Sequence, residues 1–136
     1  GKAGHVMDEE IDKLQGWISV YKDNWRRLKR IRVELGDEIY GDQVLEIGFA
    51  RHPKAKSGQM ASAIRQLLGA IKHYFDELVE KVHVTAYTDQ LNEQSEKVLR
   101  AAGFNKVAEV LYRNNNKTKD NLFMLDWKKW EENLKN

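Results

Sequence analysis

A short basic stretch before the longest helical pattern of the chain has the composition of an anion-binding loop. It reads K-A-K-S-G-Q, residues 54–59. Lys54 and Lys56 supply cations, and Gly58 would let a phosphate approach the backbone. The first N–H groups of the following helix have no partner inside it, and the helix dipole is positive at this end. An ordinary solvated turn with a Gly near the helix start fits the same residues, so both interpretations stay open.

A second pair of polar side chains stands at the start of N-E-Q-S-E-K-V-L-R-A-A-G-F, residues 92–104. Asn92 is a favourable N-cap, because its side-chain oxygen can accept a backbone N–H of the first turn. Gly103 can take the left-handed conformation that ends a helix, and Phe104 then begins the next element. A short helix is therefore predicted, with Asn92 and Ser95 side by side on its first turn. Ser95 could contact a ligand there, or only a backbone carbonyl of its own helix.

These two groups are positioned by a strand–helix–strand pattern. Residues 58–80 carry apolar side chains at helical spacing, which predicts a long amphipathic helix. The apolar stripe consists of Met60, Ile64, Leu67, Leu68, Ile71, Phe75, Leu78 and Val79. Strands are predicted before it at residues 44–51 and after it at residues 81–88. Strands joined by a crossover helix lie parallel in one sheet, so these two are expected to be parallel neighbours.

The C-terminal third of the sequence predicts an antiparallel hairpin. Its strands are residues 106–113 and 120–127, joined by the polar turn N-N-N-K-T-K. A short, fraying helix is expected after the hairpin, in K-K-W-E-E-N-L-K-N.

The beginning of the chain is ambiguous between strand and helix. Residues 16–21 and 28–35 read as strands, whereas the apolar residues between 11 and 28 also fall on one helical stripe. Gly16 and the β-branched residues that follow it favour the strands, because Gly costs a helix about 1 kcal/mol relative to Ala.

One domain is expected in a chain of 136 residues. Residues 16–127 are assigned to it, and its class is α+β, with a mixed, mostly antiparallel sheet and one central parallel pair. Residues 1–15 are assigned to a tail that could begin with a cloning remnant, and residues 128–136 to a C-terminal tail.

The composition excludes several kinds of site. There is no cysteine, which removes disulfides, thiolate nucleophiles and Cys-ligated zinc. The four histidines, His5, His52, His73 and His83, lack metal-ligand spacing, so no metal is expected. No G-x-S-x-G motif marks a serine nucleophile.

The net charge of +2 gives no whole-molecule attraction to nucleic acid or to an anionic membrane. A local exception is W-R-R-L-K-R-I-R, residues 25–32, with five basic side chains beside a Trp. This run could bind RNA, but a solvated face is the commoner role of such a run, so nucleic acid is not the expected partner. No apolar run is long enough to span a membrane and no signal peptide is seen, so a cytoplasmic protein is expected.

Several short motifs occur together between residues 46 and 104. E-I-G-F is followed by H-P, then by S-G-Q-M-A-S-A, N-x-x-S and A-G-F. In this order they resemble the GNAT superfamily of acyl-CoA-dependent N-acetyltransferases, and most closely its branch that acetylates the N-termini of ribosomal proteins. The resemblance extends from about residue 16 to residue 127. It implies a GNAT-like fold of three-layer α/β type, in which a long crossover helix and two splayed parallel strands hold acetyl-CoA as co-substrate without a metal.

The resemblance also implies which residues contact acetyl-CoA. The loop before the long helix would cradle the pyrophosphate, and backbone groups near Phe49 and Arg51 would hold the pantetheine arm and the acetyl carbonyl. Asn92 would orient this arm through its side-chain amide. The full set of implied cofactor-binding residues is Phe49, Ala50, Arg51, Lys54, Lys56, Ser57, Gly58, Gln59, Met60, Asn92 and Ser95.

Two residues are implied to catalyse the transfer. Ser95 would lie near the CoA sulfur and donate a proton to the departing thiolate. Many relatives use a Tyr slightly later in the helix, where this chain has Leu99. Glu46 would accept a proton from the incoming ammonium, directly or through a water. Its alternative role is to pin the sheet through a salt bridge.

The chain departs from the family pattern in two places. In the pyrophosphate loop Ala55 stands where Arg or Gln is usual, and Met60 stands where a small residue is usual. The strand and two helices that normally begin the fold and wall the acceptor site have no counterpart before residue 16. A shortened form, a fragment, and a wall supplied by a partner chain are the alternatives, and an exposed sheet edge would favour a homodimer.

The predicted function is transfer of an acetyl group from acetyl-CoA to a primary amine, by direct attack in a ternary complex. The acceptor would be a protein N-terminus or a small amine. One alternative is an inactive CoA-binding relative that serves as a protein-interaction module. The other is an RNA-associated protein that uses residues 25–32.

Overall fold

The computed structural model describes residues 16–22, 43–52, 58–112 and 115–135. Its elements in chain order are β1 (Gly16–Lys22), β2 (Gln43–Arg51), α4 (Gln59–Phe75), the 3₁₀ helix η2 (Asp76–Lys81), β3 (Val82–Asp89), α5 (Glu93–Ala102), β4 (Phe104–Tyr112), β5 (Asn115–Leu125) and α6 (Trp127–Leu134).

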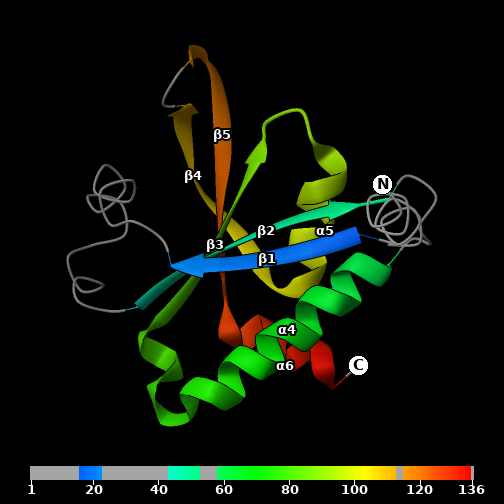
Figure 1. The fold of residues 1–136 in the computed structure, drawn as a ribbon, viewed down its shortest axis with the longest axis vertical. Coiled ribbons are helices and arrows are strands. Elements are labelled where there is room, and N and C mark those ends of the chain that lie inside the picture. The colour runs from blue at the N-terminus through cyan, green and yellow to red at the C-terminus, as the bar shows by residue number, and fades with distance from the viewer. Residues whose placement is uncertain (1–15, 23–42, 53–57, 113–114, 136) are drawn as a thin grey trace, which may run out of the picture.

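The five strands form one mixed sheet in the order β1-β2-β3-β5-β4 (Figure 1). β2 and β3 are parallel and are connected through α4, while all other neighbouring strands are antiparallel. This confirms the predicted mixed sheet, its parallel pair and its crossover helix. The β4–β5 hairpin extends well beyond the rest of the sheet (Figure 1).

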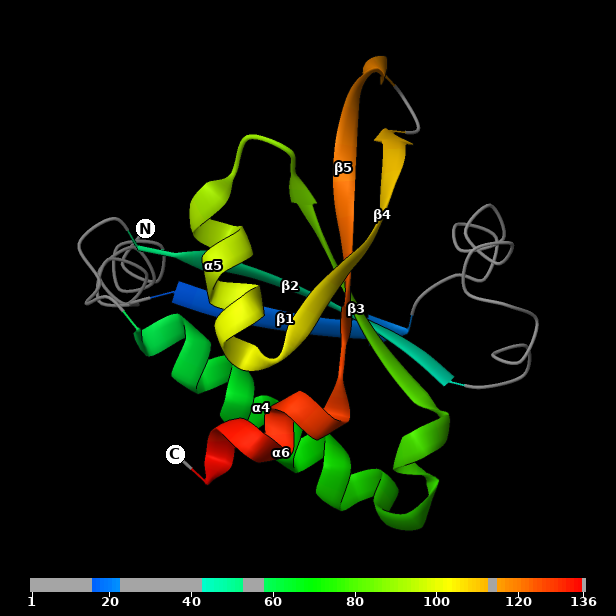
Figure 2. The same cartoon turned by 180° about the vertical axis from the view of Figure 1, so that it is seen from behind.

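The main hydrophobic core lies on one face of the sheet. Because side chains alternate between the two faces of a strand, the buried residues Val82, Val84 and Ala86 of β3 all point to this face. Helices α4, α5 and α6 pack against it, with α5 and α6 in front of the sheet in Figure 2. The core also contains Ile47, Met60, Ile64, Leu68, Ile71, Leu99, Ala102, Phe104, Phe123 and Trp130.

The long helix is shorter than its apolar pattern predicts. The α-helix ends at Phe75, and Asp76 takes a positive φ of 48°, which a non-glycine residue rarely adopts. A 3₁₀ helix follows, in which successive side chains are rotated by about 120° instead of the 100° of an α-helix. Leu78 therefore leaves the apolar stripe and is 60% exposed, so its predicted place in the core is wrong.

Strands β1, β4 and β5 form where the sequence predicts strands, but their lengths differ from the prediction. The predicted strand at residues 16–21 is β1, which pairs directly with β2, whereas the strand predicted at residues 28–35 lies outside the described residues. The hairpin strands β4 and β5 are longer than predicted, because Asn115 already pairs with Tyr112. The polar residues assigned to the turn thus belong mainly to β5, since the ladder of a hairpin is made by backbone groups that polar residues carry as well.

The predicted C-terminal helix is present as α6, and it is part of the core. Asp126 caps it, because its carboxylate accepts the N–H groups of Lys128 and Lys129 at 3.0 and 3.3 Å. Trp130 is only 5% exposed, and its indole N–H donates to the carbonyl of Arg65 in α4 at 3.1 Å. Trp127 packs edge to face on Trp130. The predicted short C-terminal helix is therefore confirmed, and Trp130 anchors it to α4.

The described residues contain neither a membrane-spanning helix nor a cluster of metal ligands. None of the described helices combines the length and the apolar character needed to cross a bilayer. Within the same part of the chain, no three His, Asp or Glu side chains gather closely enough to hold a metal ion.

Candidate active site

The parallel strands β2 and β3 separate at their C-terminal ends. Their register runs from Gln43 opposite Val82 to Glu46 opposite Thr85, and stops there. β2 continues to Arg51 along β1, while β3 continues along β5, so each strand follows its antiparallel neighbour (Figure 1). We call the resulting gap the fork; it lies between residues 47–51 of β2 and residues 86–89 of β3.

The fork leaves one edge of β2 open. On this edge the residues beyond Glu46 have no register partner on β3 within the described ranges. Backbone N–H and C=O groups are obligatory hydrogen-bonding groups, so an extended ligand carrying amides can pair with such an edge as a strand would. The last closed rung is reinforced by Thr85, whose hydroxyl donates to the carbonyl of Leu45 at 3.3 Å.

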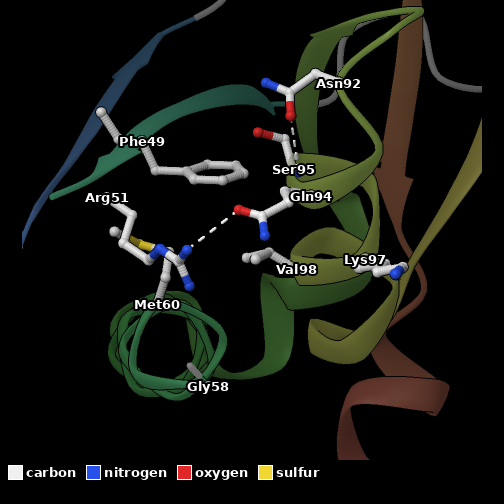
Figure 3. Close-up of a pocket in the computed structure, with 10 residues that line it drawn as sticks. Phe49, Arg51, Gly58, Met60, Asn92, Gln94, Ser95, Lys97 and Val98 are labelled. Carbon is white, nitrogen blue, oxygen red and sulfur yellow. Dashed lines mark hydrogen bonds between the residues drawn. The ribbon is translucent and has the colours of Figure 1, made fainter. Parts of the chain in front are cut away.

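A cleft of about 500 Å³ opens from the fork toward the start of α4 (Figure 3). Its lining comes from the end of β2, the start of α4 and the first two turns of α5. The lining residues are Phe49, Ala50, Arg51, Gly58, Met60, Asn92, Gln94, Ser95, Lys97 and Val98. Seven of these were predicted to bind the cofactor, and they come from segments that are far apart in the sequence.

The start of α4 faces open space. Gly58 has a φ of 88°, and a Cβ atom there would meet nothing within 4 Å. The carbonyl of Gly58 accepts the N–H of Ser62 at 3.1 Å, and no side chain of the described residues caps the helix. The helix N-terminus therefore presents free N–H groups to the end of the cleft, as an anion site requires. The predicted loop residues Lys54, Lys56 and Ser57 lie outside the described residues.

The start of α5 has the predicted cap. The side-chain oxygen of Asn92 accepts the N–H of Ser95 at 3.1 Å, and Gly103 ends the helix with a φ of 105°. Since the oxygen of Asn92 is used in the cap, its amide NH₂ remains the group directed away from the helix (Figure 3). The hydroxyl of Ser95 projects from the same turn toward the strand that carries Phe49 (Figure 3). These two side chains can therefore both donate hydrogen bonds into the cleft.

Three lining residues were missed by the sequence reasoning: Gln94, Lys97 and Val98. Lys97 and Val98 lie three and four residues after Gln94 on α5, so each of them neighbours Gln94 on the helix surface. Gln94 also receives a hydrogen bond from Arg51 at 3.1 Å, which joins the end of β2 to the first turn of α5. Helical spacing from Ser95 could have indicated Val98, whereas long polar side chains such as Gln94 and Lys97 resemble an ordinary solvated surface.

Two predicted site residues lie apart from the cleft. Glu46 is 5% exposed and does not line it. Leu45 and Ile47 point toward the helices, so Glu46 between them points to the opposite face of β2. Gln59 borders a neighbouring, mainly apolar cavity of about 290 Å³ between β1 and the start of α4. The basic run at residues 25–32 is outside the described residues.

No protein-family model and no curated protein sequence matches the chain. Solved structures do match it. A GNAT-family acetyltransferase from Bacillus anthracis has a TM-score of 0.55 and 18% identity, over 82% of this chain and 58% of the other. The aminoglycoside acetyltransferase AAC(6')-Ib, in complex with ribostamycin and coenzyme A, has a TM-score of 0.57 and 16% identity, over 88% of this chain and 61% of the other.

A third neighbour is FeeM, an N-acyl amino acid synthase from uncultured soil microbes. It has a TM-score of 0.52 and 19% identity, over 88% of this chain and 67% of the other. The chain has the GNAT acyltransferase fold. It spans less than two thirds of the length of the first two neighbours. The splayed strands that the GNAT resemblance implied are present as the fork between β2 and β3.

Proposed function

We propose that this protein transfers an acetyl group from acetyl-CoA to a primary amine. The observation that carries the proposal is the fork, because it combines an open strand edge with a cleft that ends at an uncapped helix N-terminus. Acetyl-CoA is an extended thioester whose two amides can pair with the strand edge and whose phosphorylated end can bind at the helix N-terminus. Neighbours with this fold include a GNAT-family acetyltransferase, and AAC(6')-Ib in complex with ribostamycin and coenzyme A.

The residues of the cleft fit acetyl-CoA at three places. The open edge of β2 can pair with the amides of the pantetheine arm. The NH₂ group of Asn92 can donate to the same arm from the opposite wall. N–H groups at the start of α4 can donate hydrogen bonds to the pyrophosphate, with Gly58 leaving room for its approach.

Acid and base groups would act from opposite faces of β2. Ser95 is on the helix side, where its hydroxyl can protonate the departing thiolate. Glu46 is on the other face, next to the last closed rung of the sheet, where it can take a proton from the incoming ammonium through a water. The amine would therefore enter from the face opposite the cleft and reach the thioester through the fork.

The acceptor is proposed to be a protein N-terminus or a small amine. The motifs E-I-G-F, S-G-Q-M-A-S-A and A-G-F favour the branch that acetylates ribosomal proteins. Attack is proposed to be direct, because a chain without cysteine lacks the usual thiol carrier of an acyl group.

The test of the proposal is an acetylation assay with acetyl-CoA, in which the release of free CoA thiol is measured. The acceptors are peptides with free N-termini and small polyamines. Turnover with either class supports the enzyme. Tight acetyl-CoA binding without turnover on both classes would favour the inactive relative that acts as an interaction module.

A further inference from the structure

The hydrogen bond between Arg51 and Gln94 crosses the cleft. Arg51 is the last residue of β2 and Gln94 lies in the first turn of α5, and the guanidinium donates to the side-chain oxygen of Gln94 at 3.1 Å. In Figure 3 this bond lies between two groups of lining residues. Phe49 and Ser95 are on one side of it, and Gly58 and Met60 are on the other. A ligand that extends from the fork to the start of α4 must pass this point.

The hydrogen-bond partner of the Arg51 guanidinium is a neutral amide, which binds a cation more weakly than a carboxylate does. The Arg side chain has five N–H donors in a planar arrangement that suits a phosphate or a carboxylate. Within the described ranges it makes one side-chain hydrogen bond, to a neutral amide, and no ion pair with Asp or Glu. The cation therefore stands at the border of the cleft, next to the anion-binding start of α4, without an acidic partner from the described part of the chain.

We infer that the side chain of Arg51 binds a phosphate of the donor, and that Gln94 holds Arg51 across the cleft until the donor displaces it. The inference rests on the proposed function, since it assigns a contact within the same cleft. It makes Arg51 a specificity-determining residue, which selects a phosphorylated thioester over the bare pantetheine arm. A charge-assisted bond to phosphate is stronger than the bond to Gln94, so the exchange favours the donor.

This arrangement predicts opposite effects at the two ends of one hydrogen bond. Arg51→Ala removes the phosphate contact and is expected to weaken CoA binding about tenfold or more. Gln94→Ala removes only the competing partner, so CoA is expected to bind about threefold more tightly. Gln94→Glu would hold Arg51 in an ion pair and is expected to weaken CoA binding. The double variant is expected to match Arg51→Ala, because Gln94 has no effect once the guanidinium is gone.

The experiment is titration calorimetry of these variants with CoA and with pantetheine, which has the same arm without phosphate. Arg51→Ala is expected to leave pantetheine affinity unchanged, and Arg51→Lys to recover only part of the CoA affinity, because Lys keeps the charge and loses the planar donor set. Lys128→Ala, at an exposed position on α6 that does not line the cleft, removes the same charge and is the control. Thermal melting of each variant confirms that it is folded.

Two results would overturn the inference. If Gln94→Ala weakens CoA binding as Arg51→Ala does, the pair only supports the cleft wall. If Arg51→Ala weakens pantetheine and CoA equally, the side chain does not contact phosphate. Both results leave CoA binding by the unmodified protein intact, and with it the proposed function. Absence of CoA binding by the unmodified protein would overturn both.

Discussion

Glu46 of β2 and Thr85 of β3 are the last two residues of the parallel pair that lie in register. Both are buried, and the next residues of the two strands follow different antiparallel neighbours. The point where the sheet opens is therefore also the point where a buried carboxylate stands on the face opposite the cleft. This relationship places a candidate base on one face of the fork and the candidate acid Ser95 on the other.

Asn92 is expected to have two separable roles. Asn92→Ala removes the cap of α5 and should lower the free energy of unfolding by about 1 kcal/mol, together with CoA affinity. Asn92→Asp keeps an oxygen that can accept the N–H of Ser95, so urea unfolding should remain near that of the unmodified protein. It lacks the NH₂ donor, so calorimetry should still show weaker CoA binding. Recovery of both properties in Asn92→Asp would show that this residue only caps the helix.

Ser95→Ala is expected to lower kcat with little change in stability. The N–H of Ser95, not its hydroxyl, donates to Asn92, so the cap survives the substitution. Loss of a proton donor to the thiolate should reduce kcat about 100-fold at saturating acetyl-CoA, and Ser95→Thr should retain much of the activity. Steady-state thiol release measures this. An unchanged kcat in Ser95→Ala would exclude the hydroxyl as the acid.

Glu46→Gln is expected to change the pH profile of the reaction. If the carboxylate takes the proton of the ammonium, the rate rises with pH as the carboxyl group becomes ionised, and glutamine of similar size removes this rise. Measurement of kcat/KM from acidic to alkaline pH tests it, with urea unfolding as the stability control. If the variant keeps the pH profile of the unmodified protein and loses only stability, Glu46 has the alternative role of pinning the sheet.

Trp130→Ala is expected to destabilise the whole domain by about 3–5 kcal/mol, since it removes a buried aromatic side chain that joins α6 to α4. Trp130→Phe keeps one aromatic ring but loses the hydrogen bond to Arg65 and the part of the indole that lies against Gly69, so its cost should be smaller, about 1–3 kcal/mol. Urea unfolding followed by circular dichroism provides both values. Equal stability of Trp130→Ala and the unmodified protein would show that α6 is not part of the cooperative unit.

The features that the sequence predicted correctly depend on local chemistry. The Asn92 cap and the left-handed Gly103 follow from residues close together in the chain, and the crossover between β2 and β3 follows from the periodicity of each of its three consecutive elements. The pattern gave no warning of the helix end at Phe75, because no Gly or Pro stands next to it and the break lies in the backbone of Asp76.

The missed features depend on packing between distant segments. α6 has few apolar residues besides its two tryptophans, so its sequence gives a weak signal for a core helix. The Arg51–Gln94 bond joins residues 43 positions apart, and neither type of side chain is unusual at an exposed site. Gly58, Asn92 and Ser95 were singled out by their own sequence context, whereas the other four predicted residues in the cleft came from the family resemblance alone. The fork supplies the physical reason that all seven meet.

The most direct test of the account is titration calorimetry of the purified protein with acetyl-CoA and with CoA. We expect a dissociation constant on the order of micromolar for both, as is common for enzyme substrates. Gly58→Trp should abolish the binding by filling the end of the cleft at the start of α4. Gly58→Ala, which carries the same backbone strain at a φ of 88° with a small side chain, should retain most of it. No heat of binding at millimolar ligand would contradict the claim that this fork holds acetyl-CoA.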